Sequence, residues 1–520
     1  MSDPATYISG DKLARLGAEP DGLRRLRRGI EKESLRITPD GKLSQRPHPA
    51  ALGSPLTHPR ITTDFSEAQL ELITGVHETA ADCLTELGQI HNFVFHNIGD
   101  EMMWPSSMPC LLGRDEDIPI GQYGSSNIGQ AKTVYRRGLG VRYGRLMQTI
   151  SGIHYNFSLP DEVWQQLGIH DQDGKTAAYF SLIRNFRRWS WLLVYLFGAS
   201  PAVCKSFARD LDHNLQPFDE GSLYLPHATS LRMGPLGYQS SAQTTLHISY
   251  NSLPEYAQSM VEALTTQYPE YVAAGVKKNG AHQQLNAAVL QIENEFYGTI
   301  RPKRTTASGE RPITALKARG VEYVEVRCID LNPFLPMGID AEQIAFLDTF
   351  LLLCLLADSE PDSQDESRRL ATNQQTVVEQ GRDPLVMLKR PNGEQVALTN
   401  WADELLAACQ PVAELMDEVS SSTHYSSAWQ TQQARLDDPS LTPSAQVLAE
   451  MQQLAQPFFR FSMNRAQEIK ETYLSDGLPA ELATRYAQTS RDSVTRQQEI
   501  EAADSEDFET FLQGYLALPG

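Results

Sequence analysis

Cysteine is scarce in this chain, and the cysteines present do not form a recognisable metal or disulfide motif. Six occur in 520 residues, at positions 83, 110, 204, 328, 354 and 409, and no two of them make a CxxC pair. Closely paired cysteines are typical of zinc sites, and dense cysteine frameworks are typical of small secreted domains. The sequence therefore indicates neither a zinc site nor a secreted disulfide framework, and it favours a reducing, cytoplasmic location.

Long apolar runs and an export signal are also missing. Residues 1–10 contain no basic segment followed by an apolar one, which a secretory signal peptide requires. The two most apolar segments, residues 191–197 and 350–357, are much shorter than the ~20 residues that span a bilayer. We expect both segments to be buried in the core, and we expect no association with a membrane.

Basic residues are outnumbered by acidic ones. The chain has 45 Lys+Arg against 65 Asp+Glu, which is a formal charge of −20, whereas proteins that bind nucleic acid carry a basic footprint. A nucleic-acid partner is therefore not expected. The 41% of hydrophobic and 21% of charged residues are typical of a folded globular protein.

The texture of the sequence changes near residue 340. Residues 29–333 mix short alternating stretches with Gly, Pro and aromatic residues, which predicts strands and long loops with helices such as 80–95 between them. From residue 341 strand signals fade, and segments such as 401–419 and 481–512 favour helix. We predict an α+β protein in which residues 1–340 form a sheet with inserted helices, and residues 341–520 form a mostly helical part packed on the same unit. The acidic stretch 358–369 is expected to be a surface linker or loop.

Acidic residues are absent from one long window. Residues 118–160 contain no Asp or Glu, although the average over the chain would place about five there, and the window holds five basic residues, with six glycines between Gly121 and Gly144. Glycines let backbone N–H groups approach an anion closely. This window predicts a site for a small anionic molecule, and the alternative is a loop-rich segment that happens to lack acids. The short basic run 301–304 suggests the same chemistry, or else a solvated turn.

Neither of the common glycine-rich nucleotide loops is present. The segment from Gly168 to Thr176 has five residues between its glycines, where a P-loop has four, and it carries two aspartates that would repel phosphate. The glycines from Gly138 to Gly144 miss the dinucleotide spacing by one residue. If the protein binds ATP, neither of these motifs holds it.

Carboxylates occur on strand faces that should be apolar. In residues 29–37, alternation places Glu31 and Glu33 on one face. In residues 321–329 it places Glu325, Arg327 and Ile329 on one face. Two carboxylates on a partly apolar face repel each other unless a cation joins them. The alternatives are an exposed strand end for the first pair and a cross-strand ion pair for the second.

A histidine and two further acids complete an oxygen-rich set. Residues 151–159 alternate cleanly, with His154 and Asn156 on the polar face of the predicted strand. Asp64 and Glu71 lie seven residues apart, so they would align on a helix, or Glu71 could project from a strand at 70–74. If these segments converge, the set suits Mg²⁺ or Mn²⁺, which prefer oxygen ligands and often bridge substrate phosphates.

At these same residues the sequence resembles the glutamate-cysteine ligase family of the single-chain proteobacterial type. Nine motifs in order carry the resemblance, and they extend over nearly the whole chain apart from residues 358–400 and both termini. The motifs are RGIEKESLRI from Arg28, ALGSPLTHPRITTDFSEAQLELIT from Ala51, MWPSSMPC from Met103, QYGSSNIGQAKTVYRRGL from Gln122, YGRLMQTISGIHYNFSLP from Tyr143, YLFGASPAVC from Tyr195, YLPHATSLRMGPLGY from Tyr224, LQIENEFYGTIRPKR from Leu290 and EYVEVRCIDLNPF from Glu322.

The resemblance implies a fold and a reaction. The fold would be a curved antiparallel sheet like the catalytic sheet of glutamine synthetase, surrounded by helices, with residues 1–340 as the catalytic part. The reaction would transfer a phosphoryl group from ATP to the γ-carboxylate of L-glutamate, and the amine of L-cysteine would then attack the acyl phosphate. The products would be γ-glutamylcysteine, ADP and phosphate, in the first step of glutathione biosynthesis.

The resemblance also implies residue roles. Two or three Mg²⁺ or Mn²⁺ ions would be bound by Glu31, Glu33, Asp64, Glu71, His154 and Glu325. Glu325 and Arg327 would be catalytic, with Arg327 steadying the transferring phosphoryl oxygens. Glutamate would be bound by Arg232, through its α-carboxylate, and by Gln148, Ile150 and Asn156. Cysteine would be bound by Tyr135, Tyr238, Tyr297 and Phe65, which could otherwise be ordinary core aromatics. The basic residues expected to contact ATP and its phosphates are Arg136, Arg301, Lys303 and Arg304.

Two rival functions stay open at this point. One is a ligase that activates glutamate but accepts another amine, and the aromatic residues of the cysteine pocket separate the two. The other is a metal- and nucleotide-binding regulator without catalysis, against which the retained cluster of like charges argues. The expected partners are the three small-molecule substrates, with feedback inhibition by glutathione, and the expected state is a monomer.

Overall fold

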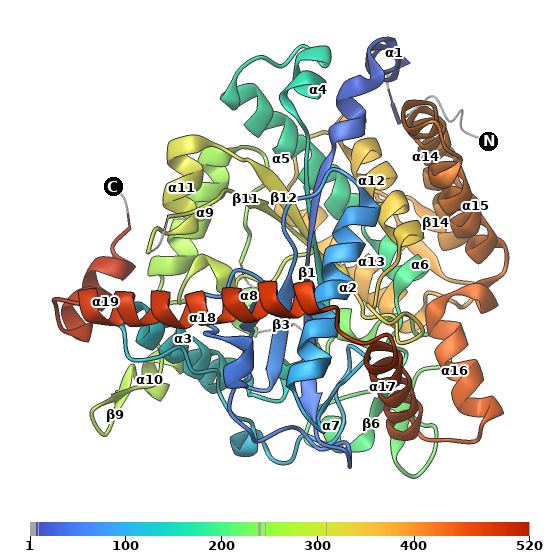
Figure 1. Ribbon diagram of the computed structural model, residues 1–520. Coiled ribbons are helices and arrows are strands. Elements are labelled where there is room, and N and C mark those ends of the chain that lie inside the picture. The colour runs from blue at the N-terminus through green and yellow to red at the C-terminus, as the bar shows by residue number, and fades with distance from the viewer. Residues whose placement is uncertain (1–6, 9, 238–240, 245, 308, 519–520) are drawn as a thin grey trace.

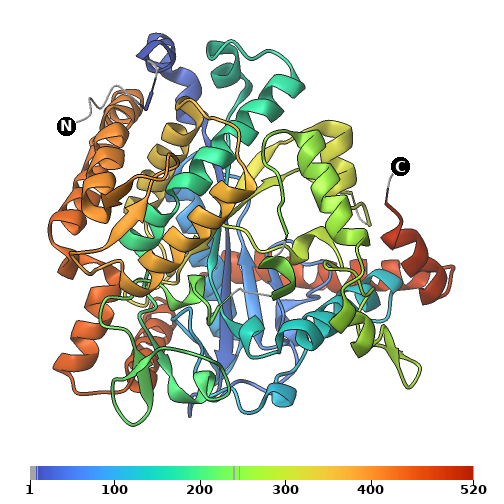
Figure 2. The same cartoon turned by 180° about the vertical axis from the view of Figure 1, so that it is seen from behind.

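An antiparallel sheet forms the centre of the molecule. The computed structural model describes residues 7–8, 10–237, 241–244, 246–307 and 309–518. In this part of the chain seven strands make one sheet in the order β11-β12-β5-β1-β3-β2, with β4 paired to β1. Helices surround the strands in both views (Figures 1 and 2). The strands are β1 (Arg27–Ile37), β2 (Ile61–Thr63), β3 (Gln69–Ile73), β4 (Met102–Met103), β5 (Ile153–Ser158), β11 (Ile300–Lys303) and β12 (Tyr323–Ile329).

The long strand β1 organises this sheet. It pairs antiparallel with β5 along one edge and with β3 along the other, and its end pairs with β4. The predicted strands at 29–37, 151–159 and 321–329 are confirmed, and Glu71 lies on a strand rather than a helix. One face prediction is wrong. A bulge between Val326 and Ile329 moves Ile329 opposite Ile153, on the apolar side, and away from the face of Glu325.

The apolar side of the sheet faces the core. Tyr155 and Phe157 on β5 are almost fully buried, as the alternation predicts. The helix α12 (Ala341–Leu356) belongs to the same hydrophobic cluster and is buried on nearly all sides. Asp348 of α12 accepts hydrogen bonds from the Tyr155 hydroxyl at 2.6 Å and from the Arg28 guanidinium at 2.8 Å. The helical part of the chain is therefore joined to the sheet by both apolar packing and a buried ion pair.

Helices occupy most of the remaining chain. In the first two thirds they are α1 (Gly10–Ala18), α2 (Ala80–Asn97), α3 (Asn127–Tyr143), α4 (Asp161–Gln166), α5 (Gln172–Trp189), α6 (Trp191–Phe197), α7 (Lys205–Ala208), α8 (Ser241–Thr244), α9 (Leu253–Thr265), α10 (Pro269–Ala274) and α11 (Pro312–Arg319). After α12 they are α13 (Gln364–Gln380), α14 (Leu398–Ser420), α15 (His424–Asp437), α16 (Pro443–Gln453), α17 (Phe458–Ser475), α18 (Ala480–Ala503) and α19 (Phe508–Leu516).

Small strand pairs lie outside the main sheet. Two of them are hairpins, one of β9 (Lys277–Lys278) with β10 (Ala281–His282) and one of β13 (Met387–Lys389) with β14 (Gln395–Ala397). A third group joins β6 (Ala202–Cys204), β7 (Gln216–Pro217) and β8 (Ser222–Tyr224). The helical character predicted for the last third is thus confirmed apart from one short hairpin. The apolar segments 191–197 and 350–357 are buried, as expected, and none of the described helices is long and apolar enough to cross a membrane.

Two segments that could have been loops throughout are loops only in part. The acidic stretch 358–369 is the predicted surface loop over residues 358–363, most of which are exposed, but α13 begins at Gln364 and the side chains of Asp362 and Glu366 are buried in ion pairs with Arg187 and Arg188. The acid-free window is not mainly a loop. Much of it forms α3, capped by the Ser126 side chain, and three of its glycines lie inside that helix. Helical packing against neighbours, rather than loop flexibility, accounts for those glycines.

A disulfide bond joins Cys110 to Cys204, although the spacing of the cysteines indicated none. The two residues lie 94 positions apart in the sequence, and the bond links the segment after β4 to β6. The other four cysteines are free and buried. Such a pair leaves no short-range signature in the sequence, since only the tertiary fold brings the two residues together.

Candidate active site

Carboxylates from neighbouring strands meet on the polar face of the sheet. The register of β1 places Glu31 opposite His154 of β5 and Glu33 opposite Glu71 of β3. Directly opposite residues in an antiparallel pair point to the same side of the sheet. All four side chains line one cleft of about 730 Å³. Pairing between strands thus gathers acids that are up to 40 positions apart in the chain next to a histidine 83 positions beyond Glu71.

Two further acids face the same cleft. Glu325 of β12 is almost fully buried, and Asp64, in the turn between β2 and β3, is half-buried. Both line the cleft with the four side chains above. The six residues predicted to hold metal ions are therefore brought together on one surface.

Three of these side chains offer the tightest arrangement of donor atoms. One atom each from Glu31, Glu71 and His154 lies within 4.8 Å of the other two. The His154 ring also lies 3.3 Å from Glu31, 3.6 Å from Glu33 and 3.9 Å from Glu325. Carboxylate oxygens around an imidazole form a donor set that a hard divalent cation accepts.

The carboxylates repel one another, which helps to raise the pKa of two of them. Burial, followed by the charges of Glu31, Asp64 and Glu33, raises the pKa of Glu71 well above its usual value. Burial and the Asp64 charge raise the pKa of Glu33 as well. Like charges held together in an enclosed cleft are stable only if a cation neutralises them or if protons bind to them. The residues present therefore fit a bound divalent cation.

Basic residues flank Glu325 on the other side of the cleft. Although burial acts to raise its pKa, the Lys303 ammonium and the Arg327 guanidinium hold the pKa of Glu325 well below its usual value. Lys303 Nζ lies 3.1 Å from one carboxylate oxygen, and Arg327 Nη1 lies 3.1 Å from the other. Glu325 thus orients two cations that both face the cleft.

The other predicted phosphate contacts differ in their placement. Arg301 is buried at the cleft, where its guanidinium donates to backbone carbonyls, and Arg136 lines the cleft with its guanidinium carbon 4.4 Å from the centre of the Tyr123 ring. Arg304 does not line the cleft. It donates instead to the Arg319 carbonyl, at 2.8 Å, in an exposed contact.

Arg232 lies deep in the protein beside the sheet. Its side chain is 1% exposed, and its guanidinium donates to the Arg327 carbonyl at 2.9 Å and lies 3.7 Å from Asp330. Gly152 makes this position possible, since a Cβ at residue 152 would lie 2.7 Å from Arg232 Nε. The Gly152 N–H in turn donates to Glu33 at 2.8 Å. Gly152 therefore lies between Arg232 and the carboxylate cluster and contacts both.

The remaining predicted substrate residues fall into two groups. Gln148, Tyr135, Tyr297 and Phe65 line the cleft, and Gln148 donates to the Tyr297 hydroxyl at 2.8 Å. Asn156 donates to Glu31 at 2.9 Å, and Ile150 is fully buried and presents its carbonyl to Gln69. Tyr238 lies outside the described residues.

A second cavity of about 230 Å³ adjoins the cleft, with Tyr297 and Arg327 shared between the two. Arg232 lines this cavity, as do Arg187 and Tyr250, which the sequence analysis did not identify. The Arg187 guanidinium lies 4.5 Å from the centre of the Tyr250 ring. Three arginines, Arg187, Arg232 and Arg327, therefore line this cavity.

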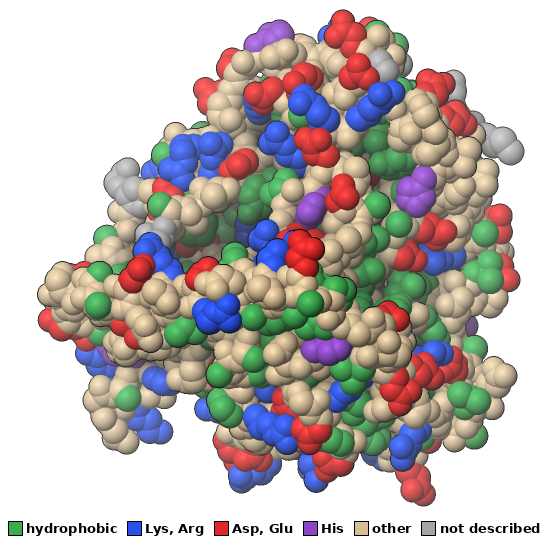
Figure 3. All heavy atoms as spheres, viewed as in Figure 1, with side chains coloured by type: hydrophobic (Ala, Val, Ile, Leu, Met, Phe, Trp, Pro, Cys, Tyr) green, Lys and Arg blue, Asp and Glu red, His purple; other side chains and the backbone are tan. Residues whose placement is uncertain are grey.

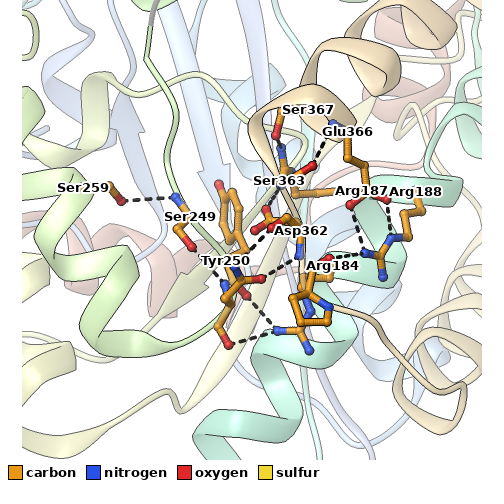
Figure 4. A network of polar contacts seen from close by, with 12 residues as sticks. Arg184, Arg187, Arg188, Ser249, Tyr250, Ser259, Asp362, Ser363, Glu366 and Ser367 are labelled. Carbon is orange, nitrogen blue, oxygen red and sulfur yellow. Dashed lines mark hydrogen bonds and ion pairs between the residues drawn. The ribbon is translucent and has the colours of Figure 1, made fainter. Parts of the chain in front are cut away.

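Figure 4 shows how this cavity wall is held. Arg187 pairs with Asp362 at 2.8 Å, and the next residue, Arg188, pairs with Glu366 at 2.7 Å. Arg184, one turn earlier on α5, donates to the Tyr250 carbonyl at 2.9 Å. The signal was present in the sequence as basic residues at helical spacing in 184–188 and an acidic stretch at 358–369, but nothing local paired them.

Comparisons with known proteins identify the class. A family model described as glutamate-cysteine ligase matches residues 13–377. The chain is 50% identical over 512 residues to a glutamate-cysteine ligase of Pseudomonas entomophila, covering 97% of this chain and 96% of that one. It is also 50% identical over 502 residues to a glutamate-cysteine ligase of Alcanivorax borkumensis, covering 94% and 95%.

Solved structures agree with this result. A glutamate-cysteine ligase of Francisella tularensis, crystallised in complex with AMP, superposes with a TM-score of 0.90 at 36% identity and covers 95% of this chain and 97% of that one. A bifunctional glutathione synthetase of Pasteurella multocida superposes with a TM-score of 0.68 at 25% identity over 88% of this chain and 54% of that one. The predicted α+β fold with a glutamine synthetase-like sheet is confirmed.

The fold and the comparisons define an ATP-dependent ligase that joins a carboxylate to an amine. The chain belongs to the glutamate-cysteine ligase family. Its reaction is the ATP-dependent formation of γ-glutamylcysteine from L-glutamate and L-cysteine, the first step of glutathione biosynthesis.

Proposed function

We propose that the cleft is the active site of this ligase and that its carboxylate cluster binds two or three Mg²⁺ or Mn²⁺ ions. The observation that carries the proposal is the approach of donor atoms from Glu31, Glu71 and His154 to within 4.8 Å of one another. Glu33, Asp64 and Glu325 line the same cleft and would complete the shell. When bound, the ions neutralise the triphosphate and the glutamate carboxylate, so that the two anions can approach in line.

The chain's own cations would act on the transferring group. A γ-carboxylate oxygen of glutamate attacks the γ-phosphorus of ATP, and the bond from that phosphorus to the ADP oxygen breaks, which gives γ-glutamyl phosphate and ADP. Arg327 and Lys303 are held 3.1 Å from the two oxygens of Glu325. From there they would stabilise charge on the phosphoryl oxygens. Arg301 and Arg136 would contact the remaining phosphates.

The second step joins the two amino acids. The cysteine amine attacks the acyl carbon of γ-glutamyl phosphate, the bond from that carbon to the phosphate oxygen breaks, and the amine loses a proton. Arg232 would hold the glutamate α-carboxylate in a bidentate geometry, and Gln148 and Asn156 would fix its other polar groups. Tyr135, Tyr297 and Phe65 would enclose the cysteine side chain and exclude water, which protects the acyl phosphate from hydrolysis.

The proposal extends to the state and regulation of the enzyme. Glutathione contains the γ-glutamylcysteine unit, so it would fit the same pockets and compete with glutamate. We propose feedback inhibition of this kind, together with a monomeric enzyme in the cytoplasm. Light scattering on the purified protein would test the monomer, and glutamate-dependent inhibition kinetics would test the feedback.

Two matched variants test the catalytic assignment. Glu325→Gln removes the charge that orients Lys303 and Arg327, and we expect turnover to fall on the order of 10²-fold or more. Glu322→Gln changes a glutamate three residues away that is half-exposed and lies outside the cleft, and it should retain normal turnover. The assay is ADP release with glutamate and ATP, with and without cysteine or 2-aminobutyrate. Normal turnover in Glu325→Gln would show that the cleft is misassigned.

Metal binding can be measured without turnover. Mn²⁺ titration followed by electron paramagnetic resonance should show bound ions in the normal protein and fewer in Glu31→Gln, because Glu31 contributes to the closest donor set. Equal occupancy in both proteins would contradict the proposed shell.

A further inference from the structure

The last two helices form an arm that borders the cleft. We use the term C-terminal arm for α18 and α19, residues 480–516, which lie beyond the segment that the family model matches. In Figure 1 α18 crosses in front of the strands, and Figure 3 shows the surface hollowed beside this ridge. No role was predicted for the arm from the sequence.

The first helix of the arm is docked on the segment before β2. The Ser54 N–H donates to Ser493 Oγ at 2.9 Å, and Thr57 Oγ1 donates to the Ser493 carbonyl at 2.5 Å. Gly53 adopts a φ of 78°, and a Cβ there would lie 2.8 Å from the Ser490 Cα, so α18 approaches the backbone directly. This contact requires a glycine, which indicates a built interface rather than a loosely lying helix.

The second helix of the arm is docked on α3 and α11. Leu512 forms a small hydrophobic cluster with Ala131 and Val134 of α3. The side-chain amide of Asn127, at the start of α3, donates to the Glu506 carbonyl at 2.9 Å, and Arg311, just before α11, donates to the Leu516 carbonyl at 3.3 Å. The arm therefore contacts α3 and the start of α11, two elements that also line the cleft.

Three side chains of the arm line the cleft itself, namely Arg496, Ile500 and Tyr515. Arg496 and Ile500 are four positions apart on α18 and so lie on one face of the helix. Ile128 at the start of α3 and Pro312 at the start of α11 line the cleft as well. These elements bring apolar side chains to the cleft together with the basic residues Lys132, Arg136 and Arg496, whereas the strands supply Glu31, Glu33, Glu71 and Glu325.

A nucleotide has two chemically different ends that match these two walls. Its phosphates require cations, which the strand side of the cleft supplies through Lys303, Arg327 and the proposed metal ions. Its base and sugar require apolar or planar surfaces. The cleft volume of about 730 Å³ is within the range of pockets that enclose molecules of this size. The wall that remains for the nucleoside is the one that the arm completes.

We propose that the C-terminal arm is the nucleoside-binding wall of the active site. Ile500 and Tyr515 pack against the adenine ring, and Arg496, held by Glu499 at 3.0 Å, extends its guanidinium plane along the base. The arm then determines the affinity for the nucleoside part of ATP and leaves glutamate and cysteine binding to other residues. This inference rests on the proposed position of the triphosphate at the carboxylates.

The test uses alanine variants of the full-length enzyme with matched controls on the same helix. Ile500→Ala is compared with Val494→Ala, and Arg496→Ala with Arg491→Ala, because Val494 and Arg491 are exposed on α18 and do not line the cleft. We expect the KM for ATP to rise about 5- to 20-fold in Ile500→Ala and Arg496→Ala, which is the scale of a lost contact to a base. The KM for glutamate, the kcat and the controls should change less than about twofold.

Two competitors of ATP separate the ends of the nucleotide. AMP carries the nucleoside without the terminal phosphates, so its inhibition constant should rise in the arm variants and stay normal in Glu325→Gln. Inorganic tripolyphosphate carries the phosphates alone, so its inhibition constant should show the reverse pattern. Unchanged AMP inhibition in the arm variants would overturn the proposal for the arm, as would an equal loss of AMP and tripolyphosphate binding. Normal tripolyphosphate inhibition in Glu325→Gln would instead count against the proposed triphosphate position.

Discussion

Replacing Glu71 with glutamine should have opposite consequences with and without divalent ions. Glu71 faces the cleft from β3, directly opposite Glu33, and its pKa is raised by burial and by three neighbouring carboxylates. Without a metal ion, the ionised Glu71 carboxylate is therefore repelled by these neighbouring carboxylates. With metal the same oxygen is one of the closest donors in the cluster. The substitution keeps the shape of the side chain and removes only its charge.

The magnitude follows from the donor spacing and from binding linkage. The donor atoms of this set lie within 4.8 Å of one another, and two unit charges at that distance repel by about 3.5 kcal/mol at an effective dielectric constant near 20. Glu71→Gln should therefore leave the metal-free protein as stable as before, or up to about 3 kcal/mol more stable. A single ion at about 100 times its dissociation constant stabilises the folded state by about 2.7 kcal/mol. For 520 residues, each kcal/mol changes Tm by about 1 °C.

The assay is scanning calorimetry in a chelator and in saturating Mg²⁺. The normal protein should gain about 2–3 °C for each ion bound, and Glu71→Gln should gain less than half of that, while its Tm in chelator is equal or higher. Glu78→Gln serves as the control, because Glu78 is exposed beyond the end of β3. A Tm that falls by several degrees in chelator, or an unchanged gain with Mg²⁺, would refute the reasoning.

Three further predictions concern stability away from the cluster. Burial, followed by the Arg60 charge, lowers the pKa of His58 to about 4, and its Nδ1 accepts two backbone N–H groups. An unfolded histidine titrates near 6.5. The free energy of unfolding should therefore fall by about 3 kcal/mol as the pH is lowered from above 6.5 to 4. Urea unfolding of His58→Asn should lack this part of the pH dependence. A thiol titration of the denatured protein without reductant should count four free thiols, and a count of six would contradict the disulfide. Cys110→Ser, which removes the disulfide, should lower the free energy of unfolding by about 2–4 kcal/mol. Glu366→Gln leaves the buried Arg188 guanidinium without its carboxylate partner, and it should lower the free energy of unfolding by about 3–5 kcal/mol. In the control, Asp365→Asn at an exposed position, the loss should be less than about 1 kcal/mol. Similar losses in both would show that burial of the pair is unimportant.

Much of the sheet and of its polar face could be predicted from local patterns. Alternation in residues 29–37 and 151–159 placed Glu31, Glu33 and His154 on the correct faces, because a strand has a period of two that neighbouring residues alone reveal. The same rule failed at Ile329, where a bulge adds one residue to β12. A bulge depends on how the partner strand fits, and the sequence of one strand does not record that.

The charged residues show more clearly which features a local pattern predicts and which depend on the tertiary fold. Lys303 and Arg304 are adjacent and similar in sequence, yet Lys303 faces Glu325 in the cleft and Arg304 binds the Arg319 carbonyl outside it. Arg187 was not predicted from the sequence to be a site residue, yet it lines the same cavity as Arg232. Which member of a basic run reaches a site depends on strand register and helix docking.

The sequence by itself determined the kinds of chemistry in this protein: carboxylates on strand faces, an acid-free window, no closely paired cysteines for a zinc site and a set of motifs that marks one ligase family. The tertiary structure decided the composition of the cleft. It brought Cys110 and Cys204 together across 94 positions, buried Asp362 and Glu366 in ion pairs with α5, and brought the C-terminal arm to the cleft. The reason is that side-chain direction within a strand is a local property, whereas neighbours across a cavity are set by long-range packing of segments that are distant in the chain.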